Sequence, residues 1–89
     1  MTPEEVMEAV ARLCRKFKAK HVFLYGSRAK GTQVERSDID IAVSGVSDFW
    51  GLLEEVEEIP TLYRIDLLNL DTCKNQELLE DITKYGREI

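Results

Sequence analysis

The sequence predicts an α/β (α+β) fold, in which a small mixed β-sheet is packed with helices. Segments of strand length, rich in apolar and β-branched residues, alternate along the chain with amphipathic segments of helical period. With 89 residues, of which 44% are hydrophobic, the chain is long enough for one core and too short for two. We therefore expect residues 1–89 to form a single domain.

Three segments have the composition of strands. Residues 21–25 are apolar, β-branched or aromatic for most of their length and stop at Gly26, which is typical of a buried strand that ends in a turn. Residues 38–43 and 63–70 alternate in polarity, which indicates strands with two different faces. One face of each alternating strand is apolar enough to pack on helices, and the other face presents aspartate.

The first helix is predicted to begin close to the start of the sequence. Residues 2–5 read Thr-Pro-Glu-Glu, which is a capping box with proline at the first helical position. The apolar positions that follow form one stripe at helical spacing: Val6, Val10, Leu13 and Phe17. Cys14 is expected to pack at the edge of this stripe.

Two further helices are predicted, one between the aspartate-bearing strands and one after them. The first of these ends before Pro60 and the second ends at Gly86. Their caps are, in that order, Ser47 or Asp48 and Thr72 or Asn75. Their apolar positions are Phe49, Leu52, Leu53 and Val56, and then Leu78, Leu79, Ile82 and Tyr85. Trp50 is expected to pack in the core, whereas an exposed Trp50 would indicate a surface for a partner.

The turn after the first strand has the composition of a phosphate-binding loop. Gly26 lets the backbone approach a ligand without a Cβ in the way, and Ser27 offers a hydroxyl group. The amides at the start of a short following helix can point at phosphate oxygens. Arg28, Lys30 and Arg36 add positive charge, although each also fits a solvated position in a polar loop.

Three aspartates on two strands indicate a metal site. Asp38 and Asp40 share a strand face with Cα atoms roughly 6.5–7 Å apart, so their charges repel unless a cation lies between them. Oxygen ligands suit Mg²⁺ or Mn²⁺. Asp66 reaches the same cluster if its strand is adjacent, and a two-metal site of this kind favours in-line phosphoryl displacement. Asp66 would then orient or deprotonate the attacking hydroxyl. Asp38 alone also fits a turn.

The ordered set of Gly26-Ser27, ten residues, Asp38-x-Asp40 and a later Asp66 on its own strand resembles the DNA polymerase β-type nucleotidyltransferase superfamily. The closest resemblance is to its smallest branch, the minimal nucleotidyltransferases (MNT), and it covers nearly the whole chain. It implies a polymerase β-like nucleotidyltransferase fold. It also implies nucleotide binding at Gly26, Ser27 and Arg28, and catalytic metal binding at Asp38, Asp40 and Asp66.

The resemblance implies a partner as well as a reaction. Minimal nucleotidyltransferases are commonly paired with a small helical HEPN protein, and in such toxin–antitoxin pairs they transfer AMP from ATP to a tyrosine of the HEPN toxin. We therefore expect an Mg²⁺-dependent enzyme, with Mn²⁺ as a substitute, that acts on a partner protein within a hetero-oligomer. The alternative is a binding module that neutralises a partner without catalysis. A small-molecule acceptor such as an aminoglycoside is a further alternative.

The net charge of −5 argues against a protein that follows long nucleic acid, because such proteins usually present a basic surface. Basic residues gather only near the end of the first predicted helix: Arg12, Arg15, Lys16, Lys18 and Lys20. Cations are favoured at a helix C-terminus, which accounts for them. A docking patch for an acidic partner is the alternative.

The remaining features predict a cytoplasmic protein. No apolar stretch is long enough for a transmembrane helix, and the first residues lack the apolar segment of a signal peptide. Cys14 and Cys73 have no metal-binding spacing and are expected to be reduced thiols. His21, at the start of a strand, is expected to serve packing or to lie on the surface.

Overall fold

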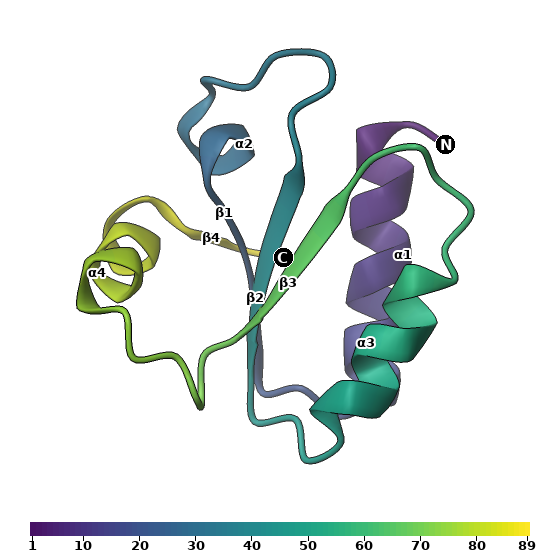
Figure 1. The fold of residues 1–89 in the computed structure, drawn as a ribbon, viewed down its shortest axis with the longest axis vertical. Coiled ribbons are helices and arrows are strands. Elements are labelled where there is room, and N and C mark those ends of the chain that lie inside the picture. The colour runs from purple at the N-terminus through teal and green to yellow at the C-terminus, as the bar shows by residue number, and fades with distance from the viewer.

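A four-stranded sheet with the order β3-β2-β1-β4 forms the middle layer in the computed structural model, which describes residues 1–89 (Figure 1). The strands are β1 (His21–Tyr25), β2 (Ile39–Ser44), β3 (Ile65–Asn69) and β4 (Arg87–Glu88). The helices are α1 (Pro3–Lys16), α2 (Ser27–Lys30), α3 (Phe49–Glu57) and α4 (Gln76–Tyr85). Helices α1 and α3 lie together on one face of the sheet, and α4 lies on the other face. The predicted α/β architecture is confirmed.

The sheet is mixed because β2 has neighbours of both directions. It pairs antiparallel with β1 and parallel with β3. The apolar face of β2 lies against α1 and α3, where Ile39, Ile41 and Val43 are fully buried. The strand begins one residue later than expected, so Asp38 immediately precedes it. This packing fixes which face of the sheet the aspartates occupy.

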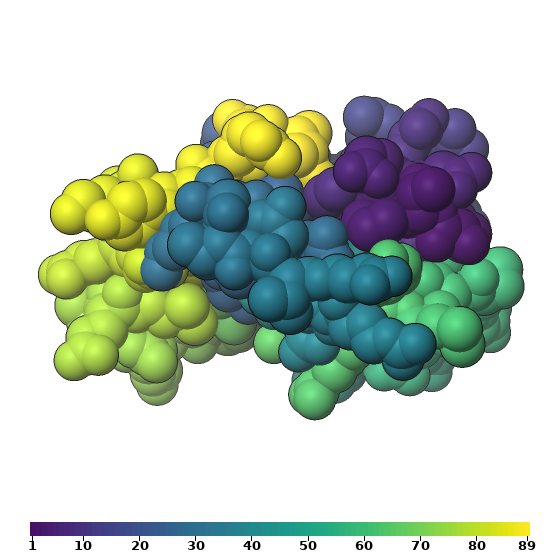
Figure 2. Space-filling model, turned by 90° about the horizontal axis from the view of Figure 1, so that it is seen from above, coloured from purple at the N-terminus to yellow at the C-terminus, as the bar shows by residue number.

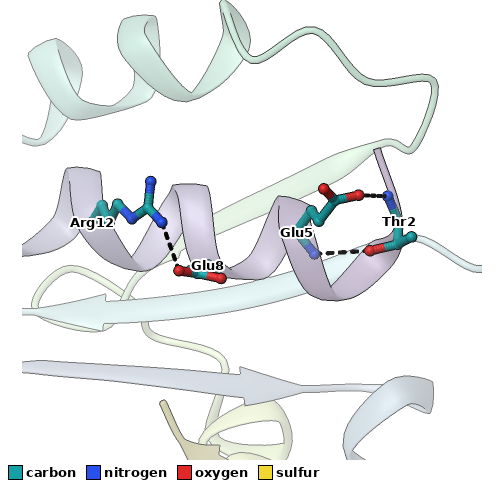
Figure 3. Close-up of polar contacts among 4 residues, drawn as sticks. All are labelled: Thr2, Glu5, Glu8 and Arg12. Carbon is teal, nitrogen blue, oxygen red and sulfur yellow. Dashed lines mark hydrogen bonds and ion pairs between the residues drawn. The ribbon is translucent and has the colours of Figure 1, made fainter.

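Helix α1 begins with the predicted capping box (Figure 3). Thr2 Oγ1 accepts a hydrogen bond from the backbone N–H of Glu5 at 3.1 Å, and Glu5 Oε1 accepts one from the backbone N–H of Thr2 at 2.8 Å. One turn further, Arg12 pairs with Glu8 at 2.6 Å. Cys14 is fully buried in the main core cluster, so its expected place at the edge of the apolar stripe is wrong.

Two of the clustered basic residues lie where cations are favoured, at the C-terminal end of α1. Arg15 and Lys16 occupy its last turn. Lys16 also reaches across to α3, where its Nζ lies 2.7 Å from Glu55 Oε1. This ion pair ties the two helices that cover one face of the sheet.

Helix α3 contradicts one prediction. Asp48 caps it by accepting a hydrogen bond from the backbone N–H of Gly51, and Leu52 and Val56 enter the core as expected. Trp50, however, is 74% exposed, so its expected core position is wrong. Residues two positions apart point away from each other on a helix, so burying Leu52 turns Trp50 toward solvent.

Helix α4 ends at Gly86 as predicted, but the chain then adds a strand that the sequence did not predict. Asn75 caps the helix and Ile82 is its one buried residue. Strand β4 pairs antiparallel with β1, opposite Phe23 and Leu24. Two polar residues give no strand signal, which is why the prediction stopped at Gly86.

A side-chain contact also joins strand β4 to β1. His21 Nδ1 lies 2.9 Å from Glu88 Oε2, and the imidazole stacks on the ring of Phe23. His21 therefore has the packing and surface role that was expected. None of the helices combines the length and the apolar character that a membrane span requires.

Candidate active site

The Gly-Ser turn lies directly against one of the predicted metal ligands. Gly26 has a positive φ of 72°, a conformation that favours glycine. A Cβ at Gly26 would also overlap the carboxylate of Asp40. Both backbone conformation and space therefore require glycine here. Ser27 follows as the first residue of the short helix α2, which the sequence analysis expected after this turn.

Strand pairing brings the predicted carboxylates together. In the parallel register of β2 and β3, Asp40 is the partner of Asp66. Asp40 is half-buried, whereas Asp38 and Asp66 are exposed. Burial raises the pKa of Asp40 first, and the negative charges of Asp66 and then Asp38 raise it further. The three predicted aspartates therefore form one electrostatically coupled group.

This group fits a divalent cation by its chemistry. The charges of two neighbouring carboxylates raise the pKa of Asp40, so positive charge would stabilise its ionised form, and oxygen donors suit Mg²⁺ and Mn²⁺. The side chains do not form a preassembled three-ligand cluster. The roles of Asp38, Asp40 and Asp66 as metal ligands thus remain predictions that their placement supports.

The three basic residues after the turn have different surroundings. The guanidinium of Arg28 is half-buried and donates to the backbone carbonyl of Ser37 at 2.9 Å. Lys30 pairs with Asp81 of α4 at 2.9 Å. Arg36 is exposed in the loop between α2 and β2. Of the three, only Arg28 has a positive charge that acts to lower the pKa of Asp40.

Sequence reasoning missed two residues that lie near the carboxylates. Tyr25 pairs with Asp40 across β1 and β2 and is buried in a small apolar cluster with Ala42 and Ile82. Burial, followed by the charges of Asp66 and Asp40, raises the pKa of the Tyr25 hydroxyl. Arg64 is exposed beside β3, and its charge, like that of Arg28, lowers the pKa of Asp40.

A signal for both residues was present in the sequence. Tyr25 immediately precedes the Gly-Ser turn, and Arg64 lies two positions before Asp66, on the same face of an alternating strand. The alternation of this segment places Arg64 on the same face as Asp66, but the effect of its charge on Asp40 was not predicted. The opposition of Tyr25 to Asp40 depends on the register of two strands, which the sequence does not specify.

The more prominent hollows of the molecule lie away from the aspartates. The larger, of about 520 Å³, is lined by Met1, Glu35, Arg36, Pro60, Thr61, Leu62 and Tyr63. A smaller one of about 150 Å³ shares Thr61 and Tyr63 with it. Figure 2 looks onto this end of the molecule, where the loop after α2 lies between the first residues and the segment before β3. The carboxylates thus lie outside both hollows.

Comparisons with known proteins show the family and the fold. Residues 8–89 match the family described as polymerase beta, nucleotidyltransferase. A Methanocaldococcus jannaschii protein with the provisional name protein adenylyltransferase MJ1379 is 35% identical over 74 residues, which cover 75% of this chain and 73% of that protein.

Two solved structures share the fold. A crystal structure of a toxin–antitoxin with AMP-PNP has a TM-score of 0.70 and 25% identity, over 99% of this chain and 72% of that one. A mutant of the toxin–antitoxin MntA-HpeT has a TM-score of 0.71 and 26% identity, over 93% of this chain and 70% of that one.

Proposed function

Because this chain belongs to the polymerase beta nucleotidyltransferase family and is a nucleotidyltransferase, we propose that it transfers AMP from ATP to a hydroxyl group of a partner protein. The observation that carries this proposal is the strand register that sets Asp40 beside Asp66, next to the Gly26 turn. Nucleotide, metal and acceptor can then meet on one face of the sheet.

The aspartates have distinct roles in the proposed reaction. Asp38 and Asp40 would hold Mg²⁺ as a two-ion site, with Asp66 as the third carboxylate and Mn²⁺ as a substitute. Bound Mg²⁺ neutralises phosphate charge during in-line displacement at the α-phosphorus. Asp66 orients the acceptor hydroxyl and accepts its proton. The hydroxyl oxygen bonds to the α-phosphorus as the bond to pyrophosphate breaks.

The turn after β1 supplies the proposed nucleotide-binding residues. Gly26 allows the backbone to approach the β- and γ-phosphates, and the Ser27 hydroxyl donates to a phosphate oxygen. Arg28 completes the turn, and its positive charge lies close enough to act on Asp40. Gly26 and Ser27 bind the leaving part of ATP, while the α-phosphate faces the carboxylates.

The proposed partner is a small helical HEPN protein, with this chain as the antitoxin of a HEPN/MNT pair. Support comes from the two toxin–antitoxin structures that share the fold, one of them with AMP-PNP, and from the relative named as a protein adenylyltransferase. The exposed carboxylates also leave room for a protein acceptor. Two free cysteines, Cys14 and Cys73, are compatible with the cytoplasm as its location.

A second candidate function is neutralisation of the partner by binding alone. The observation that favours it is the exposure of large apolar side chains, with Trp50 at 74% and Leu62 fully exposed. In that case the complex forms and silences the partner without nucleotide transfer. Replacing Asp40 by asparagine would then leave inhibition intact.

A label-transfer assay separates the two. Purified protein is mixed with α-labelled ATP and Mg²⁺, with and without the product of the neighbouring gene, and the Asp38→Asn/Asp40→Asn variant is the control. We expect label on the neighbour, and none in the control. Co-purification without label from ATP, CTP, GTP or UTP would reject the transferase proposal and favour the binding module.

A further inference from the structure

The guanidinium of Arg28 joins three segments that surround the candidate site. Its Nη2 and Nε donate to the backbone carbonyl of Ser37 at 2.9 and 3.3 Å, and Nη2 has a longer contact of 3.5 Å with the carbonyl of Glu35. The guanidinium carbon lies 5.3 Å from the centre of the Tyr63 ring, a cation–π arrangement. One side chain thus connects α2, the loop before β2 and the segment before β3.

The carbonyl that Arg28 binds belongs to the residue before Asp38. On the other side of Asp38, the backbone N–H of Ile39 donates to the carbonyl of Arg64 at 2.9 Å. Asp38 itself is exposed and precedes the first residue of β2. Its backbone is therefore held on one side by strand pairing and on the other side by Arg28.

The loop that precedes Asp38 depends on this anchor because it has little regular structure of its own. Residues 31–38 contain no helix or strand. A local turn closes between Val34 and Ser37, where the backbone N–H of Ser37 donates to the Val34 carbonyl at 3.0 Å and the Ser37 hydroxyl accepts from the Val34 N–H at 2.9 Å. Arg28 connects this turn to the rest of the domain.

We propose that Arg28 is a positioning residue, whose bonds to Ser37 and packing on Tyr63 set the place of Asp38 for the divalent cation. The proposal rests on the proposed function in one respect, since it takes Asp38 as a metal ligand. The N–H groups of the guanidinium that contact Ser37 and Glu35 are committed to the protein, so the side chain acts chiefly through Asp38.

The geometry requires arginine specifically. A planar fork can donate from two nitrogens to one carbonyl while its face lies on an aromatic ring, whereas a lysine ammonium on a flexible stem keeps the charge and loses both features. Residues that orient metal ligands typically contribute about 10–100-fold to metal affinity. Arg28→Lys should therefore weaken metal binding although the net charge is unchanged.

The test compares Arg28→Lys, Tyr63→Leu and the double variant, with Arg12→Lys as the matched control on the exposed surface of α1. Mn²⁺ binding is measured by titration calorimetry, and the mobility of residues 31–38 by hydrogen exchange, which needs neither partner nor turnover. Melting temperatures identify any variant that fails to fold. The same titration on Asp38→Asn checks the metal role of that carboxylate.

We expect both single variants to bind Mn²⁺ about 10-fold more weakly and to exchange faster at residues 31–38. The double variant should bind Mn²⁺ no more weakly than the single variant with the lower Mn²⁺ affinity, because both changes disrupt the same contact between Arg28 and Tyr63. Arg12→Lys should match the wild type in both measurements.

Three results would overturn the proposal. The first is wild-type Mn²⁺ affinity in Arg28→Lys. The second is a combined result: Tyr63→Leu folds and binds Mn²⁺ normally, and Arg28→Lys weakens the binding of ATP alone. That pattern would mean that Arg28 binds the triphosphate directly. The third is Mn²⁺ affinity that Asp38→Asn does not change. Failure of the label-transfer assay, by contrast, would reject the proposed nucleotide transfer and leave these measurements unaffected.

Discussion

Asp40 is the residue at which stability and function oppose each other most clearly. It is half-buried on β2, beside Asp66 and against Gly26, and its surroundings raise its pKa above the usual 3.8. The folded chain therefore binds this proton more tightly than the unfolded chain. That stabilisation is complete below pH 3.8 and is lost as pH rises through the raised pKa, so at pH 7 the ionised carboxylate opposes folding.

Asp40→Asn should consequently be more stable than the wild type in the absence of divalent cations. We expect a higher melting temperature at pH 7 in EDTA, a difference that shrinks as the pH falls toward 3.8, and at least ~10³-fold less nucleotide transfer. Thermal denaturation over a pH series, with and without Mg²⁺, measures the first two. A lower melting temperature for the variant at pH 7 in EDTA would contradict this account of Asp40.

The sequence indicates the candidate site residues more readily than the residues that lie beside them. Asp40 and Asp66 stand out because aspartate is disfavoured within strands, and Gly26 gains weight only from its order relative to them. Tyr25 and Arg64 were missed because each resembles an ordinary strand residue. Only the pairing of β1, β2 and β3 shows that both lie beside Asp40.

At the scale of elements, local signals predicted the helix ends and failed for the shortest strand. The capping box of α1 and the caps of α3 and α4 involve residues close in sequence, so they can be recognised without a fold. Strand β4 has two polar residues and exists only because β1 offers an edge to pair with. Its formation is a tertiary effect, which no local pattern encodes.

The capping box of α1 makes a prediction that is independent of catalysis. Thr2→Ala removes the side-chain acceptor for the backbone N–H of Glu5, so we expect a loss of about 1 kcal/mol of unfolding free energy. For a domain of this size the melting temperature would fall by about 4–8 °C. Urea denaturation measures the change.

Thr2→Ser is the control for this cap, because it keeps the hydroxyl group and should remain close to the wild type. A Thr2→Ala variant with unchanged stability would mean that the first turn of α1 frays in solution and that the box contributes little.

At the scale of the whole molecule, the two faces of the sheet differ in how completely helices cover them. One face is closed by α1 and α3 over the main core, and the other carries α4 alone beside the aspartates (Figure 1). Alternation in β2 and β3 predicts this division. The order of the strands and the placement of α4 were not predicted. Both depend on the path of the chain after β3, which passes through α4 before β4 pairs with β1.

Trp50 provides a test of whether the molecule works within a complex. It is the single tryptophan of the chain and is 74% exposed at the start of α3, so its fluorescence should be that of an indole in water. We expect Trp50→Ala to change stability by no more than about 0.5 kcal/mol and to weaken binding of the partner by about 10-fold or more.

Titration of the native chain with the product of the neighbouring gene measures this binding directly. A buried indole in the complex should shift the tryptophan emission to shorter wavelength, and Trp50→Phe, which keeps an aromatic ring, should retain most of the affinity. Unchanged emission on complex formation, together with wild-type affinity in Trp50→Ala, would place the partner elsewhere on the surface. The exposed tryptophan would then have no role in assembly, and the open aspartate face beside α4 would be the next surface to test.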